Sequence, residues 1–276
     1  MMVVPHNSTA SCGFTQRVQR PPPPRALWLP LWLRRTLWSV LFVFGARPSA
    51  RLAALFVPAL WFFPDANKGE EEEEHVCALT IDDAPGDEPL LNELLDTLDR
   101  YKARATFFVT SGMAARCAET DALARIVRRG HDLANHLVED MSYAAYGAKA
   151  FRAALEECQR VIDEVNERVG VAAERKERFY RPPRGRINKA HRRVLAEQGY
   201  CVVMGDVFPN DPHILDAKYI ANFVGTKARP GSIVILHMPE RGFRDTSLRG
   251  VAGALARMSL RNLRCNTLAA CQARHR

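Results

Sequence analysis

The stretch HVCALTIDDAP, residues 75–85, decides the fold, because a strongly apolar segment runs directly into two adjacent carboxylates. The residues HVCAL are nearly all apolar, which is typical of a strand that is buried on both faces of a sheet. Asp82 and Asp83 therefore stand where this strand ends and meets solvent, a usual position for chemistry. An isolated Asp-Asp pair more often caps a following helix, so a catalytic interpretation requires other residues that converge on it.

Seven strand-like segments alternate with helix-like segments from residue 75 onward. We expect strands at 75–81, 105–110, 131–136, 178–181, 200–206, 232–237 and 263–268. Between them, apolar residues recur with a spacing near that of a helix, as in the leucine-rich segment 89–101. This alternation predicts an α/β fold, a distorted parallel (β/α) barrel with about seven βα units and covering helices.

Composition and charge exclude several other classes of protein. The chain has 276 residues, of which 47% are hydrophobic and 25% charged, an ordinary globular balance. The net charge of +8 is spread over predicted helix faces without interleaved aromatic residues, so we expect no nucleic-acid partner. Seven cysteines without a CxxC pair argue against a cysteine-ligated zinc site and a disulfide framework, with one or two bridges left open.

The first 74 residues differ in composition from the rest of the chain. Residues 1–64 contain no Asp or Glu, but they carry seven arginines, a PPPP run and two apolar stretches. Each stretch, 36–46 and 52–63, is shorter than the roughly 20 residues that span a bilayer. We therefore divide the chain into an Arg-rich, partly hydrophobic region that ends in an acidic linker (1–74) and a barrel domain (75–276).

This N-terminal region predicts that the chain is targeted. Arginines before the apolar stretches and acidic residues after them favour an anchor whose N-terminus stays on the cytoplasmic side. We therefore expect the secretory pathway or a membrane as the location, with residues 26–63 as the membrane-associating segment. Targeting to an organelle is the alternative, because an Arg-rich leader without acids is also typical of transit peptides, and an untargeted tail stays open.

Polar residues gather at the ends of the predicted strands. They are Asp82, Asp83, His136, Asp140, Arg181, Asp206 and His237. A lone histidine at a strand end is more often a hydrogen-bonded core residue, but the strand ends of a parallel barrel share one face, where barrel enzymes build their sites. Asp83, His136 and Asp140 would supply three N/O ligands, the number that leaves a catalytic zinc or similar divalent ion an open position.

Five short motifs carry a family resemblance over about residues 75–270. They are TIDDAP, GHDLANHLVED, FYRPPRG, GDV and GSIVILH, in this order. Together they resemble the polysaccharide deacetylases, the NodB-homology domain of carbohydrate esterase family four. The resemblance implies a NodB-like barrel that removes acetyl groups from N-acetylated oligo- or polysaccharides of the chitin type. It also implies a divalent metal, with zinc as the first choice and manganese or cobalt as alternatives.

The resemblance implies a division of labour between the two adjacent carboxylates. Asp82 matches the general base, which must stay free to take a proton, and Asp83 matches the first metal ligand. His136 matches the second ligand. Asp140 stands where the family pattern has a further histidine, and its carboxylate would add a negative charge and favour harder ions such as Mn²⁺.

The resemblance also assigns residues to the leaving-group side of the reaction. Arg181 would orient the base, and the backbone N–H of Arg184 would stabilise the tetrahedral oxyanion. Asp206 would tune His237, which matches the general acid that protonates the departing amine. Leu236 would line the pocket for the acetyl methyl group.

The chain departs from the family pattern at further positions. Ala84 replaces a usual glycine, and the aromatic residue of the fourth motif is missing, with Phe208 nearby and Asp211 as an additional acid. Two other functions therefore stay open: hydrolysis of a non-glycan amide, and glycan binding by a degraded site. The retained Asp82 and His237 argue against the second, because binding alone needs no acid–base pair.

Overall fold

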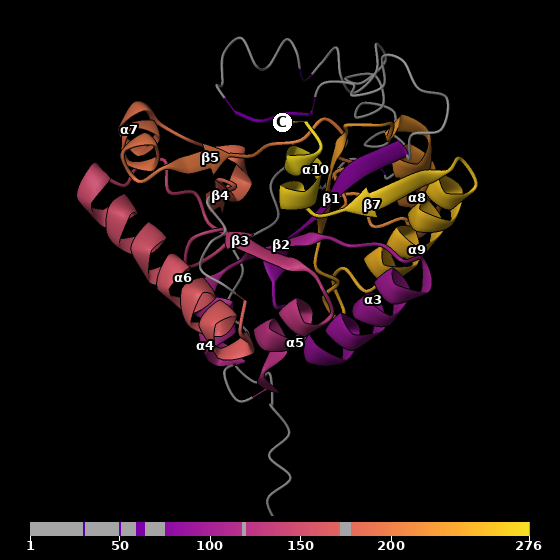
Figure 1. Cartoon of the computed structure of the whole chain (residues 1–276), viewed down its shortest axis with the longest axis horizontal. Coiled ribbons are helices and arrows are strands. Elements are labelled where there is room, and N and C mark those ends of the chain that lie inside the picture. Colours follow the sequence, from indigo (N-terminus) through magenta and orange to yellow (C-terminus); the bar gives the residue numbers. More distant parts are fainter. Residues whose placement is uncertain are drawn as a thin grey trace, which may run out of the picture.

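The computed structural model describes residues 30, 50, 59–63, 75–117, 120–171 and 178–275 of the chain. Its core is a seven-stranded parallel sheet in the order β5-β4-β3-β2-β1-β6, with β7 also paired to β1 (Figure 1). The strands are β1 (His75–Ala84), β2 (Thr106–Val109), β3 (Asp132–Asn135), β4 (Arg178–Tyr180), β5 (Tyr200–Val202), β6 (Ile233–His237) and β7 (Leu263–Asn266). The parallel α/β barrel predicted from the sequence is thereby confirmed.

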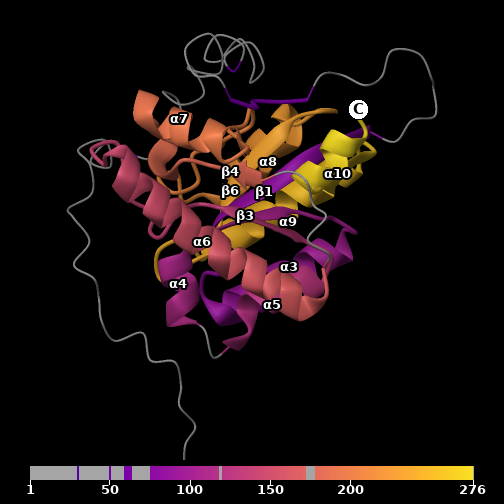
Figure 2. The same cartoon turned by 60° about the vertical axis from the view of Figure 1, so that its left-hand side comes forward.

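Helices follow most of the strands, because neighbouring parallel strands must be joined by a crossover of a dozen or more residues. Helices α3, α5, α6, α8 and α9 cover the outside of the sheet, and α10 packs against β1 (Figures 1 and 2). The helices are α3 (Glu88–Arg100), α4 (Ser111–Arg116), α5 (Ala122–Arg128), α6 (Ala148–Val169), the 3₁₀ helix η3 (Pro183–Gly185), α7 (Lys189–Glu197), α8 (Ala217–Lys227), α9 (Thr246–Ser259) and α10 (Leu268–Ala273).

Strand β1 lies between two apolar cores, which explains why it is apolar almost throughout. Cys77, Leu79 and Ile81 point outward into the core shared with the covering helices. Ala78 points inward into a second, smaller core inside the barrel, where α10 adds Leu268. Because successive side chains of a strand alternate between faces, the inward row continues towards Asp82 and the mouth of the barrel.

The barrel closes irregularly between β5 and β6. Beyond β5 the chain loses regular pairing, but Val207 forms an isolated parallel bridge with Val234 of β6. The N–H of Ile235 donates to the Val207 carbonyl at 2.9 Å. These contacts bring the loop that follows β5 next to the end of β6, where further polar residues stand.

Residues 59–63 fill the remaining gap in the barrel wall. Leu60 bridges Val203 in parallel orientation, and Phe62 bridges Ser232 in antiparallel orientation. This short segment therefore touches the chain beyond β5 on one side and the start of β6 on the other. It supplies backbone partners that the sheet would otherwise lack at this seam.

The N-terminal boundary expected from the sequence needs one correction. We expected residues 52–63 to belong to the leader, but the described residues 59–63 belong to the barrel wall. The rest of the segment 26–63, apart from Pro30 and Ala50, lies outside the described residues, so its membrane role stays a prediction. Among the described residues, no helix is both long and apolar enough to cross a bilayer.

Replacement of Phe63 tests the contribution of this segment. The Phe63 side chain is 3% exposed and its ring stacks on His275 with centroids 5.1 Å apart. We expect Phe63→Ala to lower the free energy of unfolding by about 3–5 kcal/mol, because it leaves a cavity in the inner core. Urea unfolding followed by circular dichroism measures this. Leu260→Ala is the control, since Leu260 is 88% exposed and its loss should cost less than about 0.5 kcal/mol; equal losses would show that residues 59–63 add no stability.

Candidate metal centre and active site

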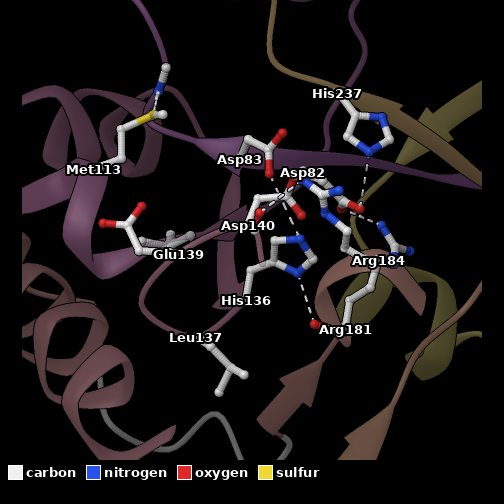
Figure 3. Close-up of polar contacts among 12 residues, drawn as sticks. Asp82, Asp83, Met113, His136, Leu137, Glu139, Asp140, Arg181, Arg184 and His237 are labelled. Carbon is white, nitrogen blue, oxygen red and sulfur yellow. Dashed lines mark hydrogen bonds and ion pairs between the residues drawn. The ribbon is translucent and has the colours of Figure 1, made fainter. Parts of the chain in front are cut away.

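Asp82 and Asp83 are buried in one site, although adjacent residues of a regular strand point to opposite faces (Figure 3). The backbone explains the exception. Asp83 has a left-handed conformation with φ of 67°, and the pairing of β1 with β2 shifts its register between Ile81 and Ala84. Such an irregularity re-aims a side chain at the end of a strand. The two carboxylates can therefore serve the same reaction.

Arg181 holds the Asp82 carboxylate in place. Its Nη1 donates to Asp82 Oδ1 at 2.6 Å and to Thr80 Oγ1 at 2.7 Å. Its Nη2 donates to the Met204 carbonyl at 2.8 Å, and the guanidinium lies 4.2 Å from the ring centroid of Phe108. The structure thus brings Arg181 and Asp82 together, as an orienting role requires, and fixes the guanidinium from several sides.

His136 presents its Nε2 atom towards Asp83. Its Nδ1 lies 2.8 Å from the carbonyl oxygen of Arg181, which can only accept, so Nδ1 carries the proton and Nε2 keeps its lone pair. Nε2 lies 3.8 Å from Asp83 Oδ1. That oxygen is buried and has no hydrogen-bond partner among the described residues. A buried carboxylate oxygen of this kind is costly unless a cation or water lies beside it.

Asp140 completes a candidate metal centre. Asp83, His136 and Asp140 each offer one ligand atom, and these atoms lie within 4.8 Å of one another. The Asp140 side chain is 43% exposed, so solvent reaches this side of the centre. Partial burial and the Asp83 carboxylate raise the pKa of Asp140 above its ordinary value, against the effect of His136 and Arg184. One imidazole and two carboxylates are a donor set that fits a catalytic divalent cation with open positions.

Arg244 is a site residue that the sequence did not reveal. It lies in the loop between β6 and α9, and its Nη2 donates to Asp83 Oδ2 at 2.9 Å. Burial alone would raise the pKa of Asp83, but Arg244, His237 and His136 together lower it to about 2. The two residues are 161 positions apart, and Arg244 stands at no strand end, so no local pattern pairs them.

His237 is held by Asp211 rather than by Asp206. Its Nδ1 lies 3.0 Å from Asp211 Oδ1, and its backbone N–H donates to Asp211 Oδ2 at 2.9 Å. Asp206 instead accepts hydrogen bonds from the Ser232 hydroxyl and the Ile233 N–H. The expectation that Asp206 tunes His237 is therefore wrong, because Asp206 reaches the beginning of β6 and His237 lies at its end. Asp211, which the sequence left without a role, takes this position.

The charge on His237 follows from its carboxylate neighbours. Burial alone would lower the pKa of His237, but Asp211, Asp82 and Asp83 raise it to about 9. Its Nε2 lies 4.0 Å from Asp82 Oδ2, close enough for both groups to act on one substrate (Figure 3). His237 is thus protonated at neutral pH and can serve as a proton donor.

Leu236 does not face the site. It pairs with Ile81 and packs in the outer core beneath the helices. Because side chains alternate along a strand, Leu236 and its neighbour His237 point to opposite faces of the sheet. The acetyl-pocket role expected for Leu236 is therefore wrong. Ile235, two positions before His237, lies on the inward face and was missed, although the period of two could have identified it.

Arg184 and Phe208 lie near the mouth of the site. Arg184 adopts a left-handed conformation with φ of 57° in η3, and its Nη2 lies 3.4 Å from Asp140 Oδ2. The side chains of Arg184 and Asp140 are both exposed, so this ion pair contributes little to stability. The ring of Phe208 lies 5.8 Å from that of His237, centroid to centroid. The role of the Arg184 backbone N–H towards an oxyanion stays a prediction.

Comparison with known proteins identifies the family of this chain. A family model described as polysaccharide deacetylase matches residues 69–203. A chitooligosaccharide deacetylase of Sinorhizobium fredii is 30% identical over 161 residues, which cover 58% of this chain and 70% of that protein. A peptidoglycan-N-acetylglucosamine deacetylase of Bacillus cereus is 26% identical over 191 residues, which cover 69% of this chain and 66% of that protein. The chain belongs to the polysaccharide deacetylase family.

A solved structure supports the same fold. The crystal structure of a peptidoglycan N-acetylglucosamine deacetylase matches with a TM-score of 0.64 and 25% identity over 76% of this chain and 91% of that chain. The NodB-like barrel expected from the sequence is thereby confirmed. The chain spans slightly less than two thirds of the length of the Bacillus cereus relative, 66%.

Variants of Asp140 test the metal centre where the chain leaves its family pattern. We expect Asp140→Ala to weaken binding of Zn²⁺ and Mn²⁺ by about tenfold or more, because two protein donors hold a catalytic ion poorly. Asp140→His should restore binding and favour zinc over manganese, since imidazole is the softer donor. Calorimetric titration of the apo-protein measures both effects. Unchanged affinity in Asp140→Ala, with only about 1 kcal/mol of stability lost, would reduce Asp140 to a capping residue.

Proposed function

We propose that this chain is a metal-dependent hydrolase that removes N-acetyl groups from glycans containing N-acetylglucosamine. One observation carries the proposal. A cluster of residues that fits a divalent cation lies beside a base–acid pair, the buried Asp82 and the half-buried His237, whose facing atoms are 4.0 Å apart. Hydrolysis of an amide needs both groups, because water must lose a proton and the departing amine must gain one.

Asp82 accepts the proton of the attacking water. Arg181 occupies its Oδ1, so Oδ2 is the oxygen left for this task. The guanidinium is itself fixed by the carbonyls of Val203 and Met204, which holds the carboxylate in one orientation. This preorganisation matters because a shift of about 1 Å in a reacting group can cost about 100-fold in rate.

A bound divalent cation would supply Lewis-acid activation of the water and of the acetyl carbonyl. Asp83 offers Oδ1 to it, His136 offers Nε2, and Asp140 offers a carboxylate oxygen. Zinc is our first choice for the ion, because a site of nitrogen and oxygen donors generally binds it more tightly than manganese. The two hard oxygen donors keep manganese and cobalt as the alternatives. The backbone N–H of Arg184 is proposed as an additional donor to the oxyanion that forms on the substrate.

His237 delivers the proton that releases the amine. The Asp211 carboxylate accepts from Nδ1–H and keeps the ring charged, so the proton on Nε2 is the one available for transfer. When the C–N bond breaks, this proton passes to the nitrogen, and acetate and a free amine are the products. Asp211 acts through His237 and is therefore a positioning residue.

The glycan assignment is supported by the relatives. Two of them are named for peptidoglycan and for chitooligosaccharides, and both names imply an N-acetylated sugar. We therefore propose an N-acetylated oligo- or polysaccharide as the substrate. Hydrolysis of a non-glycan amide at the same site is the second candidate.

Release of acetate tests the function directly. We expect the wild type, supplied with Zn²⁺ or Mn²⁺, to release acetate from chitooligosaccharides or peptidoglycan fragments. Asp82→Asn should lower kcat by about 100- to 10,000-fold, because an amide cannot accept the proton, while bound metal stays unchanged. Enzymatic acetate detection and elemental analysis measure the two quantities.

The alternatives give different results in the same assay. Release from small N-acetyl amides but from no glycan would favour the non-glycan hydrolase. Glycan binding without any release would favour the degraded, binding-only site. Substantial turnover by Asp82→Asn would contradict its assignment as the base.

The pH profile tests the pairing of His237 with Asp211. Because the acid must be protonated, we expect the alkaline fall in activity to lie above about pH 9, where His237 loses its proton. Asp211→Asn removes the carboxylate that stabilises the imidazolium, so the alkaline limit of kcat/KM should move down by about 1–2 pH units. Asp206→Asn is the matched control and should leave that limit in place. Equal shifts in both variants would argue against the pairing.

A further inference from the structure

Arg244 is a buried cation that the proposed reaction does not use. It is 7% exposed, and its Nη2 lies 2.9 Å from Asp83 Oδ2 and 3.5 Å from Glu240 Oε2. A guanidinium is charged at every relevant pH, so a full positive charge lies beside the first ligand of the metal centre. This placement needs explanation, because a positive charge repels the cation that the site is proposed to bind.

Arg244 determines which oxygen of Asp83 faces the centre. Oδ2 accepts the hydrogen bond from Arg244, whereas Oδ1 has no hydrogen-bond partner among the described residues. Oδ1 is the oxygen 3.8 Å from His136 Nε2. Arg244 therefore leaves Asp83 with one oxygen for a cation and fixes its direction.

Arg244 is the buried cation in direct contact with the ligands of the centre. Asp83 and Asp140 contribute two negative charges, and His136 directs its Nδ1 to a carbonyl, which leaves Nε2 as the ring nitrogen for a cation. The neighbouring charges are already paired, Arg181 with Asp82 and His237 with Asp211. Arg184 contacts Asp140 from the exposed side, where solvent screens its charge. Glu240 also contacts Arg244 Nη2, at 3.5 Å, but its side chain is 21% exposed whereas that of Asp83 is 5% exposed, so the Asp83 contact is the shorter and more deeply buried one. Arg244 is thus the buried cation that acts directly on the ligand set and lowers its net charge from −2 to −1.

We propose that Arg244 offsets the second carboxylate of this metal centre and thereby sets its affinity for divalent cations. If a histidine stood in place of Asp140, the three ligands would carry a net charge of −1. With Asp140 they carry −2, and the positive charge of Arg244 returns the net charge to −1. The inference rests on the proposed function, since it assumes that Asp83, His136 and Asp140 bind a cation. Arg244 is accordingly a positioning residue that acts through Asp83.

Three variants and one control separate charge from ligand chemistry. Arg244→Gln keeps a hydrogen-bond donor but removes the charge, and we expect it to bind Zn²⁺ and Mn²⁺ about tenfold more tightly or better. Asp140→Asn keeps an oxygen donor but removes the opposite charge, and should bind about tenfold more weakly. The double variant should return to within about threefold of the wild type. Arg244→Lys retains the positive charge and should also stay within about threefold.

Calorimetric titration of each apo-protein with Zn²⁺ and with Mn²⁺ gives the dissociation constants, after circular dichroism has shown that the variant is folded. Equal or weaker binding by Arg244→Gln would overturn the inference. If Arg244→Gln alone does not fold, the comparison moves to Asp140→Asn with and without Arg244→Gln, where tighter binding by the double variant is required. A wild type that binds neither ion would overturn the metal centre itself, and the proposed function with it.

Discussion

The buried ion pair between Arg181 and Asp82 is the interaction on which the rest of the site depends. From β4, the guanidinium reaches Asp82 on β1 and the carbonyls of Val203 and Met204 beyond β5. The carbonyl of Arg181 also sets the tautomer of His136. Loss of one partner of such a pair leaves an uncompensated buried charge, which is strongly destabilising. The base and one ligand are thus aligned by the same residue that joins three parts of the barrel wall.

The strands could be predicted from the sequence because each leaves a local signal. A strand buried on both faces, such as β1, is a short apolar run, and the helices between strands show leucine stripes such as Leu91, Leu94 and Leu98. Residues 59–63 gave no such signal, since the segment is short and has the same apolar composition as the leader before it. Its place in the barrel wall depends on distant partners around Val203 and Ser232.

The candidate site could be predicted only in part. Asp82, Asp83, His136, Arg181 and His237 stand at strand ends, and the barrel brings strand ends together. Asp206 was misassigned because the chain after β5 meets β6 near the beginning of that strand. Asp206 therefore lies beside Ile233 and not beside His237 at the end of β6. Leu236 was misassigned by one position, because side chains alternate along β6 and Ile235, not Leu236, points inward. Arg244 comes from a loop, where side-chain direction depends on tertiary packing that no spacing in the sequence records.

The segment 59–63 also restricts how the chain can mature. If an N-terminal leader is removed by a processing protease, a cut after residue 63 would take this segment out of the seam between β5 and β6 and expose unpaired backbone there. It would also remove Phe63 from its stack on His275, near the other end of the chain. A leader that is cleaved must therefore be cut before residue 59 to leave a closed barrel. The motifs alone would suggest a mature protein beginning at about residue 75, which is too late.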